Sequence, residues 1–141
     1  MTINLKYKEQ VDLLIEVISP VLHDERLALK GGTAINLFTM NMPRFSVDLD
    51  VVYLPVTNRD EFISGINSVF QNMAKRLTGY SYELKRTNQG IPKQARIAKN
   101  GVDIKVEINL ILRGTVYPSK LLKLCQKAKD LFEKSTEAMC V

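Results

Sequence analysis

Histidine and cysteine are scarce in this sequence, which has one histidine and two cysteines among its 141 residues. Cys125 and Cys140 form no CxxC motif, so we expect reduced thiols rather than a disulfide or a cysteine metal site. His23 has no serine or cysteine motif beside it, which disfavours histidine-assisted nucleophilic catalysis. No apolar run approaches the roughly 20 residues that span a bilayer, and the polar N-terminus lacks a signal peptide's apolar core. We therefore expect a cytoplasmic protein that is not bound to a membrane.

The length of the chain fits one domain with a proper core and leaves no room for a second domain of ordinary size. Hydrophobic residues make up 45% and charged residues 25%, which is typical of soluble globular proteins. We expect a single domain over residues 1–141.

Positive charge is concentrated in the second half of the chain. The net charge is +5, yet residues 75–134 hold 14 basic and 5 acidic side chains. A basic half suits a phosphate-rich partner, either a nucleotide or RNA. A solvated lysine surface explains the same composition.

The spacing of apolar residues predicts alternating helices and strands. We expect helices over 7–19, from Thr33, from Asn58 to near Gly79, and over 119–138. We expect strands over 27–29, 47–54, 80–87, 95–99 and 102–110, with a loop over 88–93. Asn100-Gly101 is a strong signal for a two-residue hairpin turn. The order predicts an α+β fold, with a mixed sheet flanked by helices.

Gly31, Gly32 and Thr33 follow the first predicted strand and open a predicted helix. Glycines let the backbone approach a ligand closely, and a helix N-terminus attracts anions. The segment contains neither GxxxxGK[ST] nor GxGxxG. It is either a phosphate-binding turn or a tight structural turn.

Asp48 and Asp50 stand on one face of the next predicted strand, about 7 Å apart along it. Two carboxylates at this spacing are suitable ligands for Mg²⁺ or Mn²⁺. A solvated strand face is the alternative explanation.

Glu107 is a third acid within an apolar strand and strengthens the metal hypothesis. Three carboxylates from two strands match the arrangement that two-metal phosphoryl transfer requires. Asp103 and Asn109 share the predicted face with Glu107 and are weaker candidates for the same role.

Three blocks of the sequence together resemble a known family. KGGTAINLF, RFSVDLDVVY and IKVEINLILRGTVYP are similar to the AbiEii-type nucleotidyltransferases. These are toxins of bacterial toxin–antitoxin and abortive-infection systems, within the DNA-polymerase-β-like superfamily. The resemblance covers nearly the whole chain and implies the polymerase-β-like nucleotidyltransferase fold.

The resemblance implies roles for particular residues. It makes Asp48, Asp50 and Glu107 the catalytic, metal-binding acids. The implied nucleotide-binding residues are Gly31, Gly32, Thr33, Arg44, Ser46 and Lys105. Lys30 would join them if it faces the cleft, and a salt bridge is its alternative role. The implied reaction is Mg²⁺-dependent (or Mn²⁺-dependent) transfer of a nucleotide from a nucleoside triphosphate, such as GTP, to an acceptor such as tRNA or another RNA.

The resemblance also implies a cognate antitoxin. Family members usually continue into a helical domain that supplies a lysine and further acids, and we expect this domain to be absent here. An inactive remnant that binds nucleotide, metal or RNA without turnover is therefore an alternative function. A non-enzymatic RNA- or partner-binding module is another, suggested by a basic stripe on the last predicted helix. That stripe comprises Lys120, Lys123, Lys127 and Lys134. Self-association is also expected if a missing domain leaves apolar surface exposed.

Overall fold

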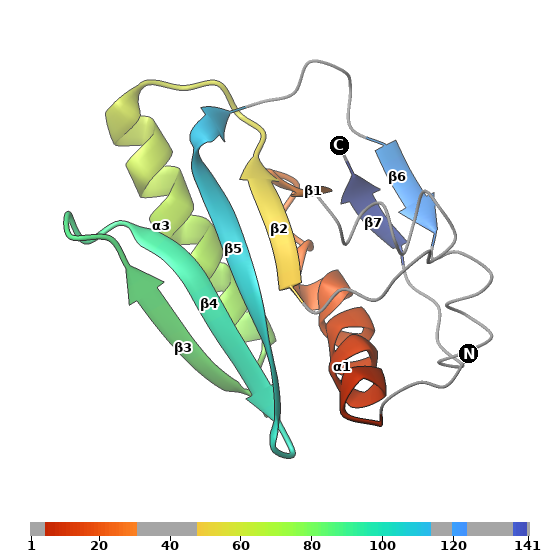
Figure 1. The fold of residues 1–141 in the computed structure, drawn as a ribbon. Helices are drawn as coiled ribbons and strands as arrows, with labels where there is room; N and C mark the ends of the chain where they lie inside the picture. Colours follow the sequence, from red (N-terminus) through yellow and green to blue (C-terminus); the bar gives the residue numbers. More distant parts are fainter. Residues whose placement is uncertain (1–4, 31–47, 114–119, 124–136, 141) are drawn as a thin grey trace.

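The fold is given by a computed structural model that describes residues 5–30, 48–113, 120–123 and 137–140 (Figure 1). Its elements in chain order are α1 (Leu5–Val21), β1 (Leu27–Lys30), β2 (Asp48–Tyr53), α3 (Arg59–Arg76), β3 (Ser81–Arg86), β4 (Pro92–Lys99), β5 (Val102–Arg113), β6 (Lys120–Lys123) and β7 (Glu137–Cys140). This arrangement confirms the predicted α+β class.

The described strands form one mixed seven-stranded sheet in the order β3-β4-β5-β2-β1-β7-β6. β2 pairs with β5 in parallel, as β1 does with β7, and the other neighbouring strands are antiparallel. Between β2 and β5 the chain passes through α3, β3 and β4. The strand of the predicted Asp-x-Asp pair therefore lies directly beside the strand of Glu107.

One face of the sheet is packed against both described helices. Alternate strand residues, such as Leu49 and Val51 of β2 and Val106 of β5, join the apolar sides of α1 and α3 in a single buried cluster. The expected stripe of α1 is fully buried at Val11 and Ile18. Because side chains alternate along a strand, the residues between them point to the other face. No described helix covers that second face, which carries the predicted acids.

Local signals set the bounds of the two helices. Asn58 caps α3, since its side-chain oxygen accepts a hydrogen bond from the Glu61 backbone N–H at 2.9 Å. α1 ends slightly later than predicted, with Pro20 inside its last turn. Close to a helix end, the missing proline N–H removes only one hydrogen bond of the helix.

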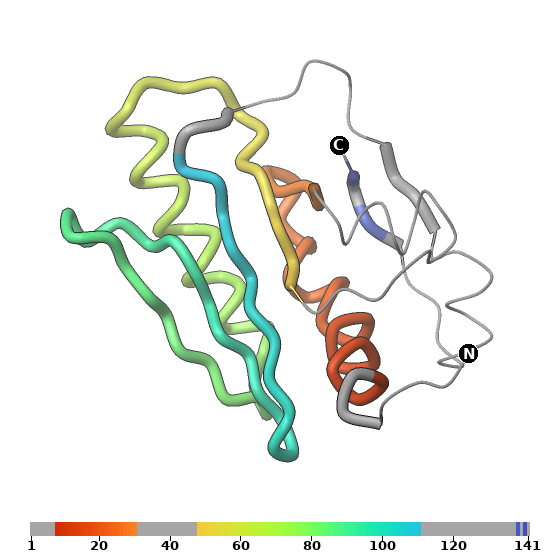
Figure 2. Tube along the Cα trace, in the orientation of Figure 1, coloured from red at the N-terminus to blue at the C-terminus, as the bar shows by residue number. Residues whose placement is uncertain are grey.

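The β4–β5 hairpin turns at Asn100-Gly101 as predicted, and both residues have positive φ, 54° and 78°. Figure 2 shows this tight reversal at the end of the sheet opposite the β2–α3 connection. β4 starts at Pro92, so the predicted loop over 88–93 is two residues too long. Proline is tolerated as the first residue of a strand.

The helix predicted over 119–138 is wrong at both of its ends, where the chain forms β6 and β7. β7 pairs with β1 through Leu29 and Cys140, and so satisfies backbone groups of β1 that β2 leaves unpaired. The spacing of apolar residues within one segment does not show that β1 needs a second strand partner. Pairing with β1 overrides the helix propensity of the segment that forms β7. Cys125 and the rest of 124–136 lie outside the described residues.

Only the first two lysines of the basic stripe predicted on that helix belong to the described residues. Lys120 and Lys123 are the two ends of strand β6, whereas Lys127 and Lys134 lie outside the described residues. The RNA- or partner-binding surface therefore stays a prediction. In the described part of the chain, no helix is long and apolar enough to cross a membrane.

Candidate functional site

The face of the sheet that points away from the helices carries charged residues at its centre. Asp48 and Asp50 of β2 project from it, and so do Lys105, Glu107 and Asn109 of β5. The residues that alternate with them, Leu49, Val51, Ile104, Val106 and Ile108, are buried in the core, as the strict alternation predicts.

Strand register places Asp50 directly beside Glu107. The Cα of Asp50 is paired with that of Glu107 on β5 and with that of Lys30 on β1. Gln94 of β4 continues the row on the far side of Glu107. Neighbouring strands lie roughly 4.8 Å apart, so Lys30, Asp50 and Glu107 are successive members of one cross-strand row.

This row opens into a cavity of about 320 Å³. Its lining residues are Lys30, Asp50, Val51, Val52, Glu107, Ile108 and Asn109. Two carboxylates and one ammonium group, contributed by three different strands, thus share one cavity. The predicted acids from two distant parts of the sequence do meet there.

The surroundings of Asp50 disfavour its ionised form. Its partial burial raises its pKa, and the nearby charges of Glu107 and then Asp48 raise it further, while Lys30 lowers it. The carboxylates of the site therefore repel one another when all are ionised. A bound cation would relieve that repulsion.

Asp48 and Lys105 form the next row of the same face, with their Cα atoms paired. Asp48 is exposed and Lys105 is half-buried. Both belong to the row next to that of Asp50 and Glu107, and neither lines the cavity. The prediction that Lys105 stands beside Glu107 on the same face is confirmed, but its direct neighbour across the strands is Asp48.

The donor chemistry of the cavity fits a hard divalent cation. In the described segments, no group of three or more histidine, cysteine, aspartate or glutamate side chains is arranged to hold a metal ion. Mg²⁺, however, is usually held by one or two carboxylates and completed by water and substrate phosphates. Asp50 and Glu107 are such a pair, with Asp48 within electrostatic range of Asp50.

Five of the six predicted nucleotide-binding residues belong to the segment between β1 and β2. Gly31, Gly32, Thr33, Arg44 and Ser46 lie outside the described residues. The segment that contains them follows Lys30, which lines the cavity, and precedes Asp48.

The orientation of Lys30 is the main feature that the sequence left open. The structure places it in the cavity lining, on the opposite side of Asp50 from Glu107. Gln94 was not predicted, although a signal existed. In a hairpin with a two-residue turn, the residues at equal distances before and after the turn are paired. With the turn at Asn100-Gly101, this rule places Gln94 opposite Glu107.

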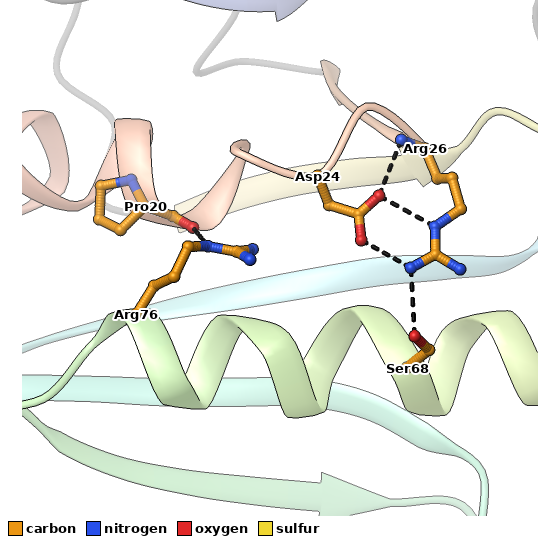
Figure 3. A network of polar contacts seen from close by, with 5 residues as sticks. All are labelled: Pro20, Asp24, Arg26, Ser68 and Arg76. Carbon is orange, nitrogen blue, oxygen red and sulfur yellow. Dashed lines mark hydrogen bonds and ion pairs between the residues drawn. The ribbon is translucent and has the colours of Figure 1, made fainter.

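A polar network fixes the start of β1 against α3 (Figure 3). Asp24 accepts hydrogen bonds from the backbone N–H, Nε and Nη2 of Arg26 at 3.0, 2.9 and 2.7 Å. Arg26 Nη2 also donates to Ser68 Oγ of α3 at 3.2 Å, and Arg76 Nε donates to the Pro20 carbonyl at 2.8 Å. The bonds of Arg26 hold the start of β1 against α3, and the Arg76 bond joins α3 to the end of α1.

Comparison with known proteins adds one match. The sequence pattern of a family described as "Nucleotidyl transferase AbiEii toxin, Type IV TA system" matches residues 12–141. The match spans both described helices and every described strand, apart from the first turns of α1. A search among curated proteins finds no match.

Proposed function

We propose that this chain, which belongs to the AbiEii nucleotidyltransferase toxin family of type IV toxin–antitoxin systems, transfers a nucleotide from a nucleoside triphosphate to an acceptor at the Asp50–Glu107 cavity. The observation that carries this proposal is the parallel pairing of β2 with β5. It sets Asp50 beside Glu107 in a cavity that Lys30 also lines.

The reaction is a displacement at phosphorus. A hydroxyl of the acceptor attacks the α-phosphorus and loses its proton, the α–β bridging P–O bond breaks, and pyrophosphate leaves. Mg²⁺, when bound, favours ionisation of the attacking hydroxyl and neutralises charge on the departing pyrophosphate. Asp50 and Glu107 would hold this ion, with Asp48 as the third acid.

The remaining roles follow the same proposal. Gly31, Gly32 and Thr33 form the phosphate-binding turn, and Gly31 follows the cavity residue Lys30 directly in the chain. Arg44 and Ser46 support that turn. Lys105, which is paired with Asp48, neutralises charge on the phosphates.

The substrates and surroundings are proposed on the chemistry of the family. We take GTP as the first nucleotide to test and RNA, including tRNA, as the acceptor. A toxin of this family implies a cognate antitoxin. The proposed place of the reaction is the cytoplasm, where nucleotides and RNA are both available.

Transfer of label tests the proposal directly. The protein is incubated with Mg²⁺, total RNA and each α-³²P-labelled nucleoside triphosphate in turn, and labelled RNA is resolved on a gel. We expect labelling with at least one nucleotide, and a loss of at least about 100-fold in Asp50→Asn and in Glu107→Gln. Lys85→Gln is the control, because Lys85 is an exposed residue of β3 outside the cavity.

Two results would overturn the proposed transfer. One is the absence of labelled product with all four nucleotides. The other is labelling that persists in both Asp50→Asn and Glu107→Gln. If calorimetry still detected binding of Mg²⁺ with GTP in the absence of labelling, the chain would be a binding protein without turnover.

A further inference from the structure

Lys30 is the cationic side chain among the residues that line the cavity. It ends β1, and its Cα is paired with that of Asp50 across the antiparallel β1–β2 contact. Asp50 therefore stands between Lys30 on one side and Glu107 on the other. Lys30 is half-buried, which limits the directions its side chain has available.

The Lys30 ammonium is not engaged by the acids beside it. No ion pair or hydrogen bond connects the Lys30 side chain to another residue of the described chain, although its charge is felt at Asp50. Arg96, on the same sheet face, is by contrast paired with Asp103 at 3.1 Å. Within the part of the chain that the structure describes, the positive charge of Lys30 is therefore not taken up by an ion pair.

The charge of the expected ligand calls for such a group. A magnesium-bound triphosphate retains net negative charge, and the acids at the cavity repel its phosphate oxygens. A lysine ammonium is a compact charge on a flexible stem and commonly binds phosphate as a point charge. Lys30 supplies that charge from the strand next to Asp50.

We propose that the Lys30 ammonium contacts the phosphate groups of the bound nucleotide, on the side of Asp50 opposite Glu107. This inference rests on the proposed function, because it assumes that a nucleoside triphosphate occupies the cavity. It assigns the substrate contact to Lys30, in addition to the metal-binding acids.

Lys85 provides a closely matched control for Lys30. It belongs to the same cross-strand row, since Lys85 is paired with Gln94 and Gln94 with Glu107. It is exposed on β3 and lies two strands away from Glu107. Lys30→Gln and Lys85→Gln change the net charge equally, so only position distinguishes them.

Binding of inorganic tripolyphosphate tests the inference without relying on turnover. Isothermal titration calorimetry measures tripolyphosphate affinity at saturating Mn²⁺ and, separately, the affinity for Mn²⁺ alone. We expect Lys30→Gln to weaken tripolyphosphate binding about tenfold or more while its affinity for Mn²⁺ alone is not weakened. Lys30→Arg retains affinity within about threefold, and Lys85→Gln binds like wild type. Circular dichroism confirms that each variant is folded.

The experiment distinguishes failure of the Lys30 inference from failure of the proposed function. If wild type and Lys30→Gln bind tripolyphosphate equally, the inference about Lys30 fails and the proposed function stands. The inference also fails if Lys85→Gln loses as much affinity, or if Lys30→Gln weakens Mn²⁺ and tripolyphosphate by the same factor. If wild type binds neither Mn²⁺ nor tripolyphosphate, the proposed function fails and the Lys30 contact fails with it.

Discussion

The hydroxyl group of Tyr53 occupies the space that a Cβ atom at Gly65 would need, and its ring carbon Cζ lies 2.7 Å from that position. Tyr53 is the last residue of β2 and is 3% exposed, while Gly65 is on the buried side of α3. The ring also packs edge-on against Phe62, with centroids 5.4 Å apart. This close approach sets how tightly α3 packs against the strand that carries Asp50.

We expect Gly65→Ala to destabilise the protein. Overpacking a tight contact costs about 1–3 kcal/mol, whereas replacing a helical glycine with alanine gains only about 1 kcal/mol. Urea unfolding should therefore show no gain in stability and a net loss of up to about 2 kcal/mol. Adding Tyr53→Phe removes the nearest atom and should restore part of the loss.

Ser64→Ala is the control for that experiment, because Ser64 is exposed on the same turn of α3. Its free energy of unfolding should stay within about 0.5 kcal/mol of wild type. A Gly65→Ala protein that is about 1 kcal/mol more stable than wild type, the gain expected from helix propensity alone, would contradict the tight Tyr53–Gly65 contact.

The Asp24–Arg26 pair predicts a stability that depends on pH. Hydrogen bonds from Arg26 hold the pKa of Asp24 below its usual value, against the opposing effect of burial. A lowered folded-state pKa stabilises the protein above the unfolded pKa of about 3.9, and this contribution is lost as pH falls through the folded value. Asp24→Asn should lower the free energy of unfolding by about 1–2 kcal/mol at pH 7 and by much less near pH 2.

Asp103→Asn is the matched control for Asp24→Asn. Asp103 also pairs with an arginine, Arg96, but both side chains are about half exposed. The Asp103 substitution should change stability by less than about 0.5 kcal/mol at either pH. An equal effect of Asp24→Asn at pH 7 and pH 2 would show that its carboxylate charge is not what stabilises the fold.

Elements with local signals were predictable from the sequence. The Asn58 cap, the apolar stripe of α1 and the Asn100-Gly101 turn each depend on residues a few positions apart. β7 depends on a partner far away in the chain, since Cys140 pairs with Leu29. No residue near Cys140 in the sequence indicates that partner, and the helix predicted over 119–138 is wrong where β6 and β7 form.

The candidate site was predictable in chemistry but not in geometry. Two acids in β2 and one in β5 were identified because carboxylates in apolar strands need a compensating partner. The parallel pairing that brings Asp50 beside Glu107 depends on the whole sheet, so the sequence alone could not supply it. The same holds for Lys30, whose face follows from its register with Asp50. The catalytic roles of these residues stay predictions.

The hairpin turn between β4 and β5 offers a test of what sets the pairing of Gln94 with Glu107. Gly101 has a φ of 78°, a conformation that costs an alanine about 1 kcal/mol or more. Gly101→Ala should lower the thermal unfolding temperature by a few degrees for a domain of this size. Asn100→Gly should be tolerated, because glycine adopts the φ of 54° found there without strain. Equal losses in both variants would contradict this explanation.

The repulsion among the site acids predicts that loss of one charge stabilises the protein without metal. Burial and the charges of Glu107 and Asp48 raise the pKa of Asp50, so ionising Asp50 costs more in the folded chain than in the unfolded chain. With a raised folded-state pKa, stability falls as pH rises through that value. Asp50→Asn should therefore raise the free energy of unfolding at pH 7 in EDTA, by no more than about 1 kcal/mol because solvent screens this partly exposed group. Mg²⁺ at ten times its dissociation constant should stabilise wild type by about 1.4 kcal/mol, and should stabilise Asp50→Asn much less.

Glu83→Gln, an exposed change on β3, is the control and should leave both the stability in EDTA and the gain from Mg²⁺ unaltered. If Asp50→Asn were less stable than wild type in EDTA, or gained as much from Mg²⁺, Asp50 would not be the acid that the metal relieves.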